Sequence, residues 1–396
     1  MFDEAPGVVL LLTADTGGGH RAAAEALRQA LHSRYPRRLV AVTCDPLTGV
    51  QANRLVGWVC RRYGTLLRAA PWLWLLVFHA SNTTIGLRIV RRLLARCASV
   101  PIAAAVAQFR PLAVVALHPL LITPAIAVIG GHSPRPALLT VITDLGTVHR
   151  GWWHPAVDRV VLPNAGHSRP HRRGDGRGMD RCDVLGLPVR EQFRLRPADP
   201  AARAALRASL GLDPERFVVL VTAGAEGVSS LAAWTRALVT GGADFDVVAV
   251  CGRNERLRAS LDRLAALCSR RLVVTGFVDN MADWLCSADV VVTKAGPGII
   301  AEAACCGVPM LLAGHLPGQE AGNTEIVVRA GAGWPVRGRR QLRAQVEYLR
   351  SNPTSLDRMR AAALRLGTPT AGDEIADLLA RQVGLHADPV PERDSR

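Results

Sequence analysis

A histidine follows three consecutive glycines near the start of the sequence, in the stretch TADTGGGH that ends at His20. Glycines at a strand-to-helix turn let backbone N–H groups approach an anion, and the helix start adds partial positive charge. An imidazole there has the right pKa range to take a proton from an alcohol. Gly17, Gly19 and Ala22 also match the relaxed GxGxxG/A dinucleotide pattern, with Asp45 ending the next predicted strand. A Rossmann dehydrogenase therefore stays a rival, although it leaves His20 unexplained.

A second small-residue turn, TKAGPGIIAE, runs from Thr293 to Glu302. It follows an apolar run and precedes a predicted helix, so its amides at Gly296 and Gly298 can face a phosphate. Glu302 in the first turns of that helix can bind two ribose hydroxyls, or it can be a surface acid that the helix dipole favours. Lys294 is the only lysine in a chain that otherwise uses arginine, which favours a site that needs an ammonium group.

A polar turn follows the apolar run 310–313 and contains Gln319, Glu320 and Asn323. Amide groups offer donors and an acceptor together, which suits sugar hydroxyls. A polar loop without a role is the alternative interpretation.

The elements that position these residues alternate between apolar runs and helix-patterned segments. The predicted strands cover 8–14, 39–44, 112–117 and 137–143 in the first half, and 217–223, 245–251, 272–275 and 290–293 in the second. Such alternation predicts parallel sheets covered by helices on both faces, with ligands beyond the carboxyl ends of the strands. We expect an α/β protein with a first domain over 1–185, a second over 186–380 and a disordered tail over 381–396.

Composition limits the possible classes. The chain has 396 residues, of which 49% are apolar and 20% charged, so it is long enough for two globular domains. Its nine cysteines form no CxxC pair, and the acidic N-terminus is followed by an apolar run too short for a signal core. These features predict a cytoplasmic protein with reduced thiols.

The stretch from Pro46 to Thr143 contains arginines but no Asp or Glu. It interleaves them with aromatic residues such as Trp72 and Trp74, and the segment 85–97 has helical spacing with basic and apolar arcs. The basic arc includes Arg88, Arg91, Arg92 and Arg96. Aromatic anchors and a cationic amphipathic helix favour an anionic membrane surface. An ordinary helix packed on its domain is the alternative; a nucleic-acid surface fits the apolar PWLWLLVF run poorly.

Seven ordered stretches between Val8 and Gly333 closely resemble monogalactosyldiacylglycerol synthases and the related bacterial diacylglycerol glucosyltransferases. They read TADTGGGHRAAAEAL, TDLGTVHRGWWH, GLPVREQF, CGRN, GFVDNM, TKAGPGIIAEA and PGQEAGN. The chain is more distantly similar to the lipid-II-forming N-acetylglucosaminyltransferase. The resemblance implies a GT-B fold of two Rossmann-like domains facing a cleft, a UDP-sugar held by the second domain, inversion at the anomeric carbon, and no metal or other cofactor.

The resemblance also implies roles for individual residues. His20 and Asp144 would be catalytic, with the choice of base between them open, and Gly17, Gly18, Gly19, His149 and Trp152 would lie on the acceptor side. The donor side would contain Gly227, Arg253, Phe277, Lys294, Gly296, Gly298, Glu302, Gln319, Glu320 and Asn323. Phe277 would mark the uracil segment. The turn 223–227 departs from the family pattern, because Ala225 narrows a loop expected to be richer in glycine.

We therefore expect transfer of galactose or glucose from a UDP-hexose to a lipid acceptor, diacylglycerol by resemblance, at the inner face of the cell membrane. The residues expected at the membrane are Trp72, Trp74, Arg88, Arg91 and Arg92. The DxD string at Asp244 begins a predicted strand, the wrong end for a metal site. A soluble hydrophobic acceptor, a UDP-sugar epimerase and a non-catalytic lipid-binding protein remain alternatives.

Overall fold

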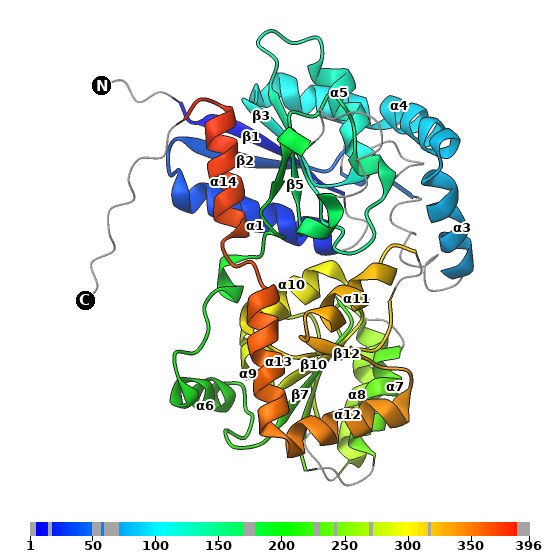
Figure 1. The fold of residues 1–396 in the computed structure, drawn as a ribbon, viewed down its shortest axis with the longest axis vertical. Helices are drawn as coiled ribbons and strands as arrows, with labels where there is room; N and C mark the ends of the chain where they lie inside the picture. Colours follow the sequence, from blue (N-terminus) through cyan, green and yellow to red (C-terminus); the bar gives the residue numbers. More distant parts are fainter. Residues whose placement is uncertain are drawn as a thin grey trace, which may run out of the picture. The chain divides into compact units, whose positions relative to one another are not determined.

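The computed structural model describes residues 5–14, 18–49, 57–58, 71–168, 179–224, 230–240, 244–268, 272–315 and 318–385. The chain divides into two compact units (Figure 1). The first combines residues up to Glu191 with those from Thr370 onward, and the second runs from Gln192 to Pro369. Each unit is built on its own parallel sheet of six strands, which confirms the predicted fold class.

The first unit has the sheet order β2-β1-β3-β4-β5-β6, and every neighbouring pair is parallel. Its strands are β1 (Gly7–Leu12), β2 (Leu39–Cys44), β3 (Ala113–Ala116), β4 (Ala137–Val141), β5 (Arg159–Leu162) and β6 (Cys182–Val184). Its α-helices are α1 (Gly18–Arg34), α3 (Pro71–Ser81), α4 (Thr84–Phe109), α5 (Ile122–Ile129) and α14 (Ala371–Gln382). Two of its single-turn 3-10 helices flank the site, η1 (Pro119–Leu121) and η2 (Arg150–Trp152).

The apolar run of β1 is buried on both faces, as in other parallel sheets. Successive side chains of a strand point to opposite faces. Val9 and Leu11 therefore pack in one cluster with residues of α1 and α14, while Leu10 and Leu12 pack in another with residues of α4 and α5. This double burial fixes the carboxyl end of β1, from which the chain enters α1.

Helix α14 corrects the predicted domain boundary at residue 380. It belongs to the first unit, where Ile375 and Leu379 are fully buried in the same cluster as Leu27 and Leu31 of α1. Figure 1 shows α14, in red, beside α1. Its apolar face needs a partner, and α1 supplies one, so the chain returns to the unit in which it began. The helix also extends past residue 381, where the tail was predicted to start; residues 386–396 lie outside the described ones.

The second unit has the sheet order β12-β11-β10-β7-β8-β9, again all parallel. Its strands are β7 (Val218–Thr222), β8 (Asp246–Val250), β9 (Leu272–Thr275), β10 (Val290–Thr293), β11 (Met310–Leu312) and β12 (Gly333–Pro335). Its helices are α6 (Pro200–Ser209), α7 (Ser230–Val239), α8 (Glu255–Leu267), α9 (Met281–Ser287), α10 (Pro297–Cys306), α11 (Ala321–Arg329), α12 (Arg339–Ser351) and α13 (Pro353–Leu366).

A buried ion cluster holds the amino end of the β7–β10 pair. The carboxylate of Asp289 lies 2.7 Å from Arg207, 3.0 Å from Arg203 and 2.5 Å from Arg360. It also accepts a hydrogen bond from the Val218 N–H at 2.8 Å. Because Asp289 and Arg207 are both buried, removing one partner would leave an uncompensated buried charge.

Helices α3 and α4 form a hairpin at the edge of the first unit. Thr83 caps α4 by accepting from the Gly86 N–H, and the helix continues through Pro101 to Phe109, beyond the predicted 85–97 segment. The inner side of α4 buries Leu87, Ala98 and Ile102. Among the described residues, no helix is both long and apolar enough to cross a bilayer.

Candidate active site

Three segments of the first unit meet at the carboxyl edge of its sheet. His20 lies in the first turn of α1, after β1, while His118 follows β3 and Asp144 follows β4. Because neighbouring strands are parallel, their carboxyl ends share one edge, where α/β sheets bind ligands. Gly18 and Gly19 are the exposed first residues of α1, whereas Gly17 lies outside the described residues.

His20 is held by Thr143, a residue that the sequence did not single out. Nδ1 of His20 lies 2.8 Å from the Thr143 hydroxyl oxygen. Burial lowers the pKa of His20 from its usual 6.5 to about 4, and a hydrogen bond to the Leu117 backbone carbonyl opposes this by raising it. The imidazole is therefore neutral at physiological pH, the state in which it can accept a proton.

His118 was also not predicted as a site residue, although it directly follows the predicted strand 112–117. Its ring meets that of His20 edge-on, with centroids 4.6 Å apart. Its Nδ1 accepts from the Leu120 N–H at 3.2 Å, so in the neutral ring the proton is on Nε2. Burial, together with the nearby His20 and His149, lowers its pKa well below the usual range.

Asp144, the other candidate base, bonds Trp152. The indole Nε1–H donates to its carboxylate at 2.6 Å, and both residues are buried. The Trp152 ring lies 6.3 Å from that of His20, centroid to centroid. Asp144 thus orients the Trp152 ring beside His20, and one of its carboxylate oxygens already accepts the hydrogen bond from the indole.

The 149–153 segment is tied to the α3–α4 hairpin. His149 accepts from the Gly151 N–H through Nδ1 at 2.9 Å and lies 3.2 Å from the Ser81 hydroxyl through Nε2. The Arg150 N–H donates to Asn82 at 2.8 Å. Burial, with a smaller effect of the nearby Arg91, lowers the pKa of His149 to about 4. His149 is buried and positions this segment.

The residues expected at the membrane differ in their exposure. Trp72 is 65% exposed, and Arg88 and Arg92 are exposed; the Trp74 side chain lies outside the described residues. Arg91 corrects the prediction, because its guanidinium turns inward and donates to the Trp153 carbonyl at 2.8 Å. It therefore braces the 149–153 segment instead of joining the exposed basic arc.

In the second unit, Lys294 directly follows β10 and pairs with Glu320 at 2.5 Å. Glu320 and Asn323 are buried, and the Asn323 amide donates to the Ala295 carbonyl at 2.7 Å. A side chain at Gly296 would approach Lys294 Nζ to 3.3 Å, so glycine keeps the backbone close to this charge. The structure thus brings together three predicted donor residues, one from the loop after β10 and two from the start of α11.

The start of α10 follows Lys294. Gly296 is its N-cap and Pro297 its first residue, so the helix N-terminus with Gly298 lies beside an ammonium group. Glu302 lies further along the same helix and is partly exposed, as is Gln319 in the 318–320 turn. A helix N-terminus beside a cation can bind a phosphate.

Arg253 and Phe277 follow β8 and β9. The guanidinium stacks over the phenyl ring with 4.4 Å from its central carbon to the ring centroid, and Phe277 is 48% exposed. An exposed ring beside a cation can stack on a heterocyclic base. Gly227, the remaining donor-side prediction, lies outside the described residues.

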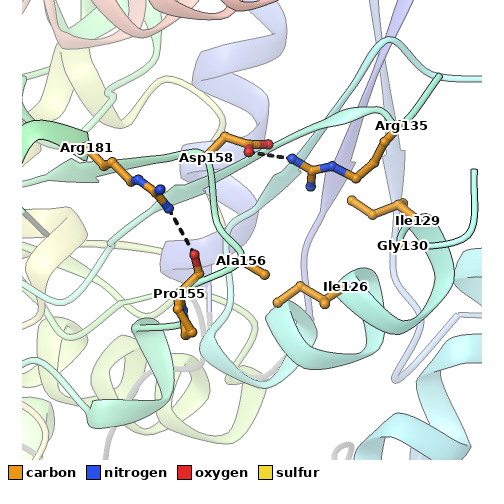
Figure 2. Close-up of a pocket in the computed structure, with 8 residues that line it drawn as sticks. All are labelled: Ile126, Ile129, Gly130, Arg135, Pro155, Ala156, Asp158 and Arg181. Carbon is orange, nitrogen blue, oxygen red and sulfur yellow. Dashed lines mark hydrogen bonds and ion pairs between the residues drawn. The ribbon is translucent and has the colours of Figure 1, made fainter. Parts of the chain in front are cut away.

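Figure 2 shows a cavity of about 260 Å³ lined by Ile126, Ile129, Gly130, Arg135, Pro155, Ala156, Asp158 and Arg181. Arg135 pairs with Asp158 at 2.5 Å, and Arg181 donates to the Pro155 carbonyl at 3.0 Å. Arg135, Asp158 and Arg181 precede β4, β5 and β6. The cavity therefore lies at the amino edge of the sheet, opposite His20, and is no part of the site.

Comparison with known proteins identifies the family of the chain. Residues 20–189 match the model of the monogalactosyldiacylglycerol (MGDG) synthase family, and residues 218–375 match the glycosyltransferase family 28 C-terminal domain. The chain is 32% identical over 379 residues to a probable monogalactosyldiacylglycerol synthase 2 of Oryza sativa, covering 92% of this chain and 78% of the relative. It is 33% identical over 383 residues to monogalactosyldiacylglycerol synthase 1 of Arabidopsis thaliana, covering 92% and 69%.

Among solved structures, MurG of Acinetobacter baumannii superposes with a TM-score of 0.61 at 15% identity, covering 95% of this chain and all of that one. A UDP-N-acetylglucosamine 2-epimerase superposes with a TM-score of 0.59 at 14% identity, covering 98% of each chain. These likenesses show the fold. The family model, the identity to these relatives over 69–78% of their length and the GT-B fold together establish that the chain is a glycosyltransferase of the monogalactosyldiacylglycerol synthase family.

Proposed function

We propose that the protein transfers galactose or glucose from a UDP-sugar to diacylglycerol at a membrane surface, with inversion and without a metal. The observation that carries the acceptor half of this proposal is the neutral His20 at the carboxyl edge of the first sheet, fixed by Thr143. Membership of a family whose named relatives are monogalactosyldiacylglycerol synthases supports the choice of diacylglycerol.

His20 takes the hydroxyl proton as the acceptor oxygen attacks the anomeric carbon. It fits this role better than Asp144, because the latter already receives a strong hydrogen bond from Trp152. A positioned base of this kind contributes about 10²- to 10⁴-fold to a rate. With the attacking oxygen on one face of the sugar and UDP leaving from the other, a single displacement inverts the anomeric carbon.

The second unit supplies the charge that balances UDP. Lys294, which pairs with Glu320 at 2.5 Å, lies beside Gly296 at the start of α10. Cations and helix N-termini stabilise the charge that develops on a leaving diphosphate. Arg253 stacked on Phe277 offers a cationic platform for the uracil. We therefore expect activity to persist in the presence of a chelator such as EDTA.

The outer face of α4 supports docking on an anionic membrane. Ile85, Ile89 and Leu93 are 72%, 54% and 60% exposed and follow one another at four-residue spacing. Arg88, Arg92 and Arg96 form an adjacent exposed row. Helix α4 packs on its domain through its inner side, but that packing leaves this apolar row exposed, and a membrane surface would cover it. The expectation of a cytoplasmic protein, peripheral on the inner face of the cell membrane, stays a proposal.

The test is UDP release by the purified protein given UDP-galactose or UDP-glucose, with and without diacylglycerol in anionic vesicles. Release that requires both one donor and diacylglycerol supports the proposal. Release without lipid would point to a soluble acceptor, and conversion of the UDP-sugar without UDP release would point to an epimerase. His20→Ala should abolish release, whereas His32→Ala, an exposed histidine on the same helix, should not.

A further inference from the structure

The contact between Thr143 and His20 sets which nitrogen of the imidazole can act. Thr143 lies two residues beyond the end of β4 and is 4% exposed. We propose that Thr143 is a positioning residue, which accepts a hydrogen bond from Nδ1–H of His20 and thereby leaves Nε2 to take the proton of the acceptor hydroxyl. This inference rests on the proposed role of His20 as the base.

The direction of the hydrogen bond follows from the chemistry of a neutral imidazole. One ring nitrogen carries the proton and the other carries the lone pair. Nδ1 is engaged by Thr143 at 2.8 Å, so a base that acts on substrate must use Nε2, and the proton must then be on Nδ1. A neutral imidazole carries a single N–H, so in this assignment the Leu117 carbonyl, which can only accept, shares the same Nδ1–H.

Neighbouring rings hold the imidazole in this orientation. His118 meets it edge-on at 4.6 Å and is itself fixed through Nδ1 by the Leu120 N–H. Trp152 lies 6.3 Å away and is tethered by Asp144. A ring flip that exchanged the two nitrogens would break the Thr143 contact within this packing.

Among the residues that the structure describes, two titratable groups lie close to His20, His118 and Asp144. His118 contacts it, His149 influences His118, and the carboxylate of Asp144 is turned to the Trp152 indole. Thr143 thus takes the position that a carboxylate holds in an acid–histidine pair, but it brings no charge. A neutral partner stabilises the imidazolium less than a carboxylate does, in keeping with the low pKa of His20. His20 therefore stays unprotonated, and able to accept a proton, throughout the neutral pH range.

The experiment compares Thr143→Val, which keeps the shape and removes the hydroxyl, with Thr143→Ser, which keeps the hydroxyl. Assays use diacylglycerol vesicles and whichever of UDP-galactose and UDP-glucose is the donor. We expect Thr143→Val to lower kcat about 10- to 100-fold, the range for losing one hydrogen bond to a group that becomes charged. The KM for the UDP-sugar should stay within about twofold, and Thr143→Ser should restore most of the rate.

A spectroscopic measurement reads the tautomer without activity. In histidine-labelled ¹⁵N NMR spectra at neutral pH, the His20 signals, identified by their loss in His20→Asn, should show a protonated Nδ1 and an unprotonated Nε2. The Thr143→Val variant should shift this population toward the other tautomer. A protonated Nε2 in the unsubstituted protein would overturn the inference.

The outcomes also separate this inference from the proposed function. If His20→Ala is inactive but Thr143→Val, folded as shown by an unchanged melting curve, keeps its kcat, the positioning role is wrong and the base assignment survives. If His20→Ala stays active, both the base assignment and the role of Nε2 are wrong, while diacylglycerol-dependent UDP release still stands by itself.

Discussion

Replacing Ile89 with serine should weaken binding to membranes without affecting the fold. Ile89 is 54% exposed in the middle of the apolar row of α4, between Ile85 and Leu93. Fully burying an isoleucine side chain contributes about 1.5–3 kcal/mol, so burying the exposed half contributes roughly 1–1.5 kcal/mol. The partition coefficient onto vesicles should therefore fall about fivefold to tenfold.

The adjacent Arg92 provides an electrostatic counterpart. A basic residue near an anionic surface contributes about 1 kcal/mol, so Arg92→Gln should lower binding about fivefold on anionic vesicles and not on neutral ones. The Arg92 effect should shrink as salt is added, because exposed charges are screened within about 10 Å at 0.1 M salt. The Ile89 effect should persist in salt.

Sedimentation of the protein with vesicles of defined anionic content measures both effects. Leu267→Ser is the matched control, because Leu267 is 85% exposed on α8 of the second unit. We expect this control to bind vesicles as the unsubstituted protein does. Equal binding by Ile89→Ser, or an equal loss in Leu267→Ser, would refute the assignment of the α4 face to the membrane.

Three further predictions concern the donor side, stability and pH. Lys294→Gln removes the cation beside the α10 N-terminus. Steady-state kinetics should then show a KM for the UDP-sugar raised about tenfold or more and an unchanged KM for diacylglycerol. An equal rise in both KM values would count against a role of Lys294 in donor binding. Asp289→Ala strips the buried Arg207 of its partner and should lower the free energy of unfolding by about 3–5 kcal/mol in denaturant titrations; a loss below about 1 kcal/mol would contradict the buried-charge argument. His20 and His149 have folded-state pKa values of about 4 against 6.5, so their stability contribution is complete above about pH 6.5 and is lost as the pH falls toward about 4. These two rings alone should lower the free energy of unfolding by on the order of 2–3 kcal/mol between about pH 7 and 5.5, and His118, whose pKa burial also lowers, adds to the loss. Equal stability would show that these rings are not buried as neutral groups.

The alternation of apolar runs predicted the strands well, because central strands of parallel sheets are continuous in their hydrophobicity. The runs 39–44, 272–275 and 290–293 coincide with β2, β9 and β10. Strands β5, β6 and β12 were not predicted, and β6 and β12, with three residues each, carry too little pattern to be found. The docking of helix α14 on α1 was not predictable, because it depends on packing between the two ends of the chain.

Within the candidate site, residues beside glycine turns were selected from the sequence because a turn that needs close backbone approach leaves a local signature. Thr143 was missed because a threonine at the end of an apolar run is common in strands, and its role appears only when His20 comes within 2.8 Å. His118 could have been found because it directly follows the predicted strand 112–117, and α/β sheets bind ligands beyond the carboxyl ends of their strands. The inward turn of Arg91 was not predictable from helical spacing, because a neighbouring segment supplies the Trp153 carbonyl that holds it.

The central claim is that a hexose moves from UDP to diacylglycerol with His20 as the base. The most direct measurement follows radiolabelled hexose from UDP-galactose or UDP-glucose into the organic phase after incubation with diacylglycerol vesicles. The account predicts label in a hexosyl-diacylglycerol for one donor, lost in His20→Ala and retained in His32→Ala. Label that stays in the aqueous phase, as free sugar or as a converted UDP-sugar, would contradict it.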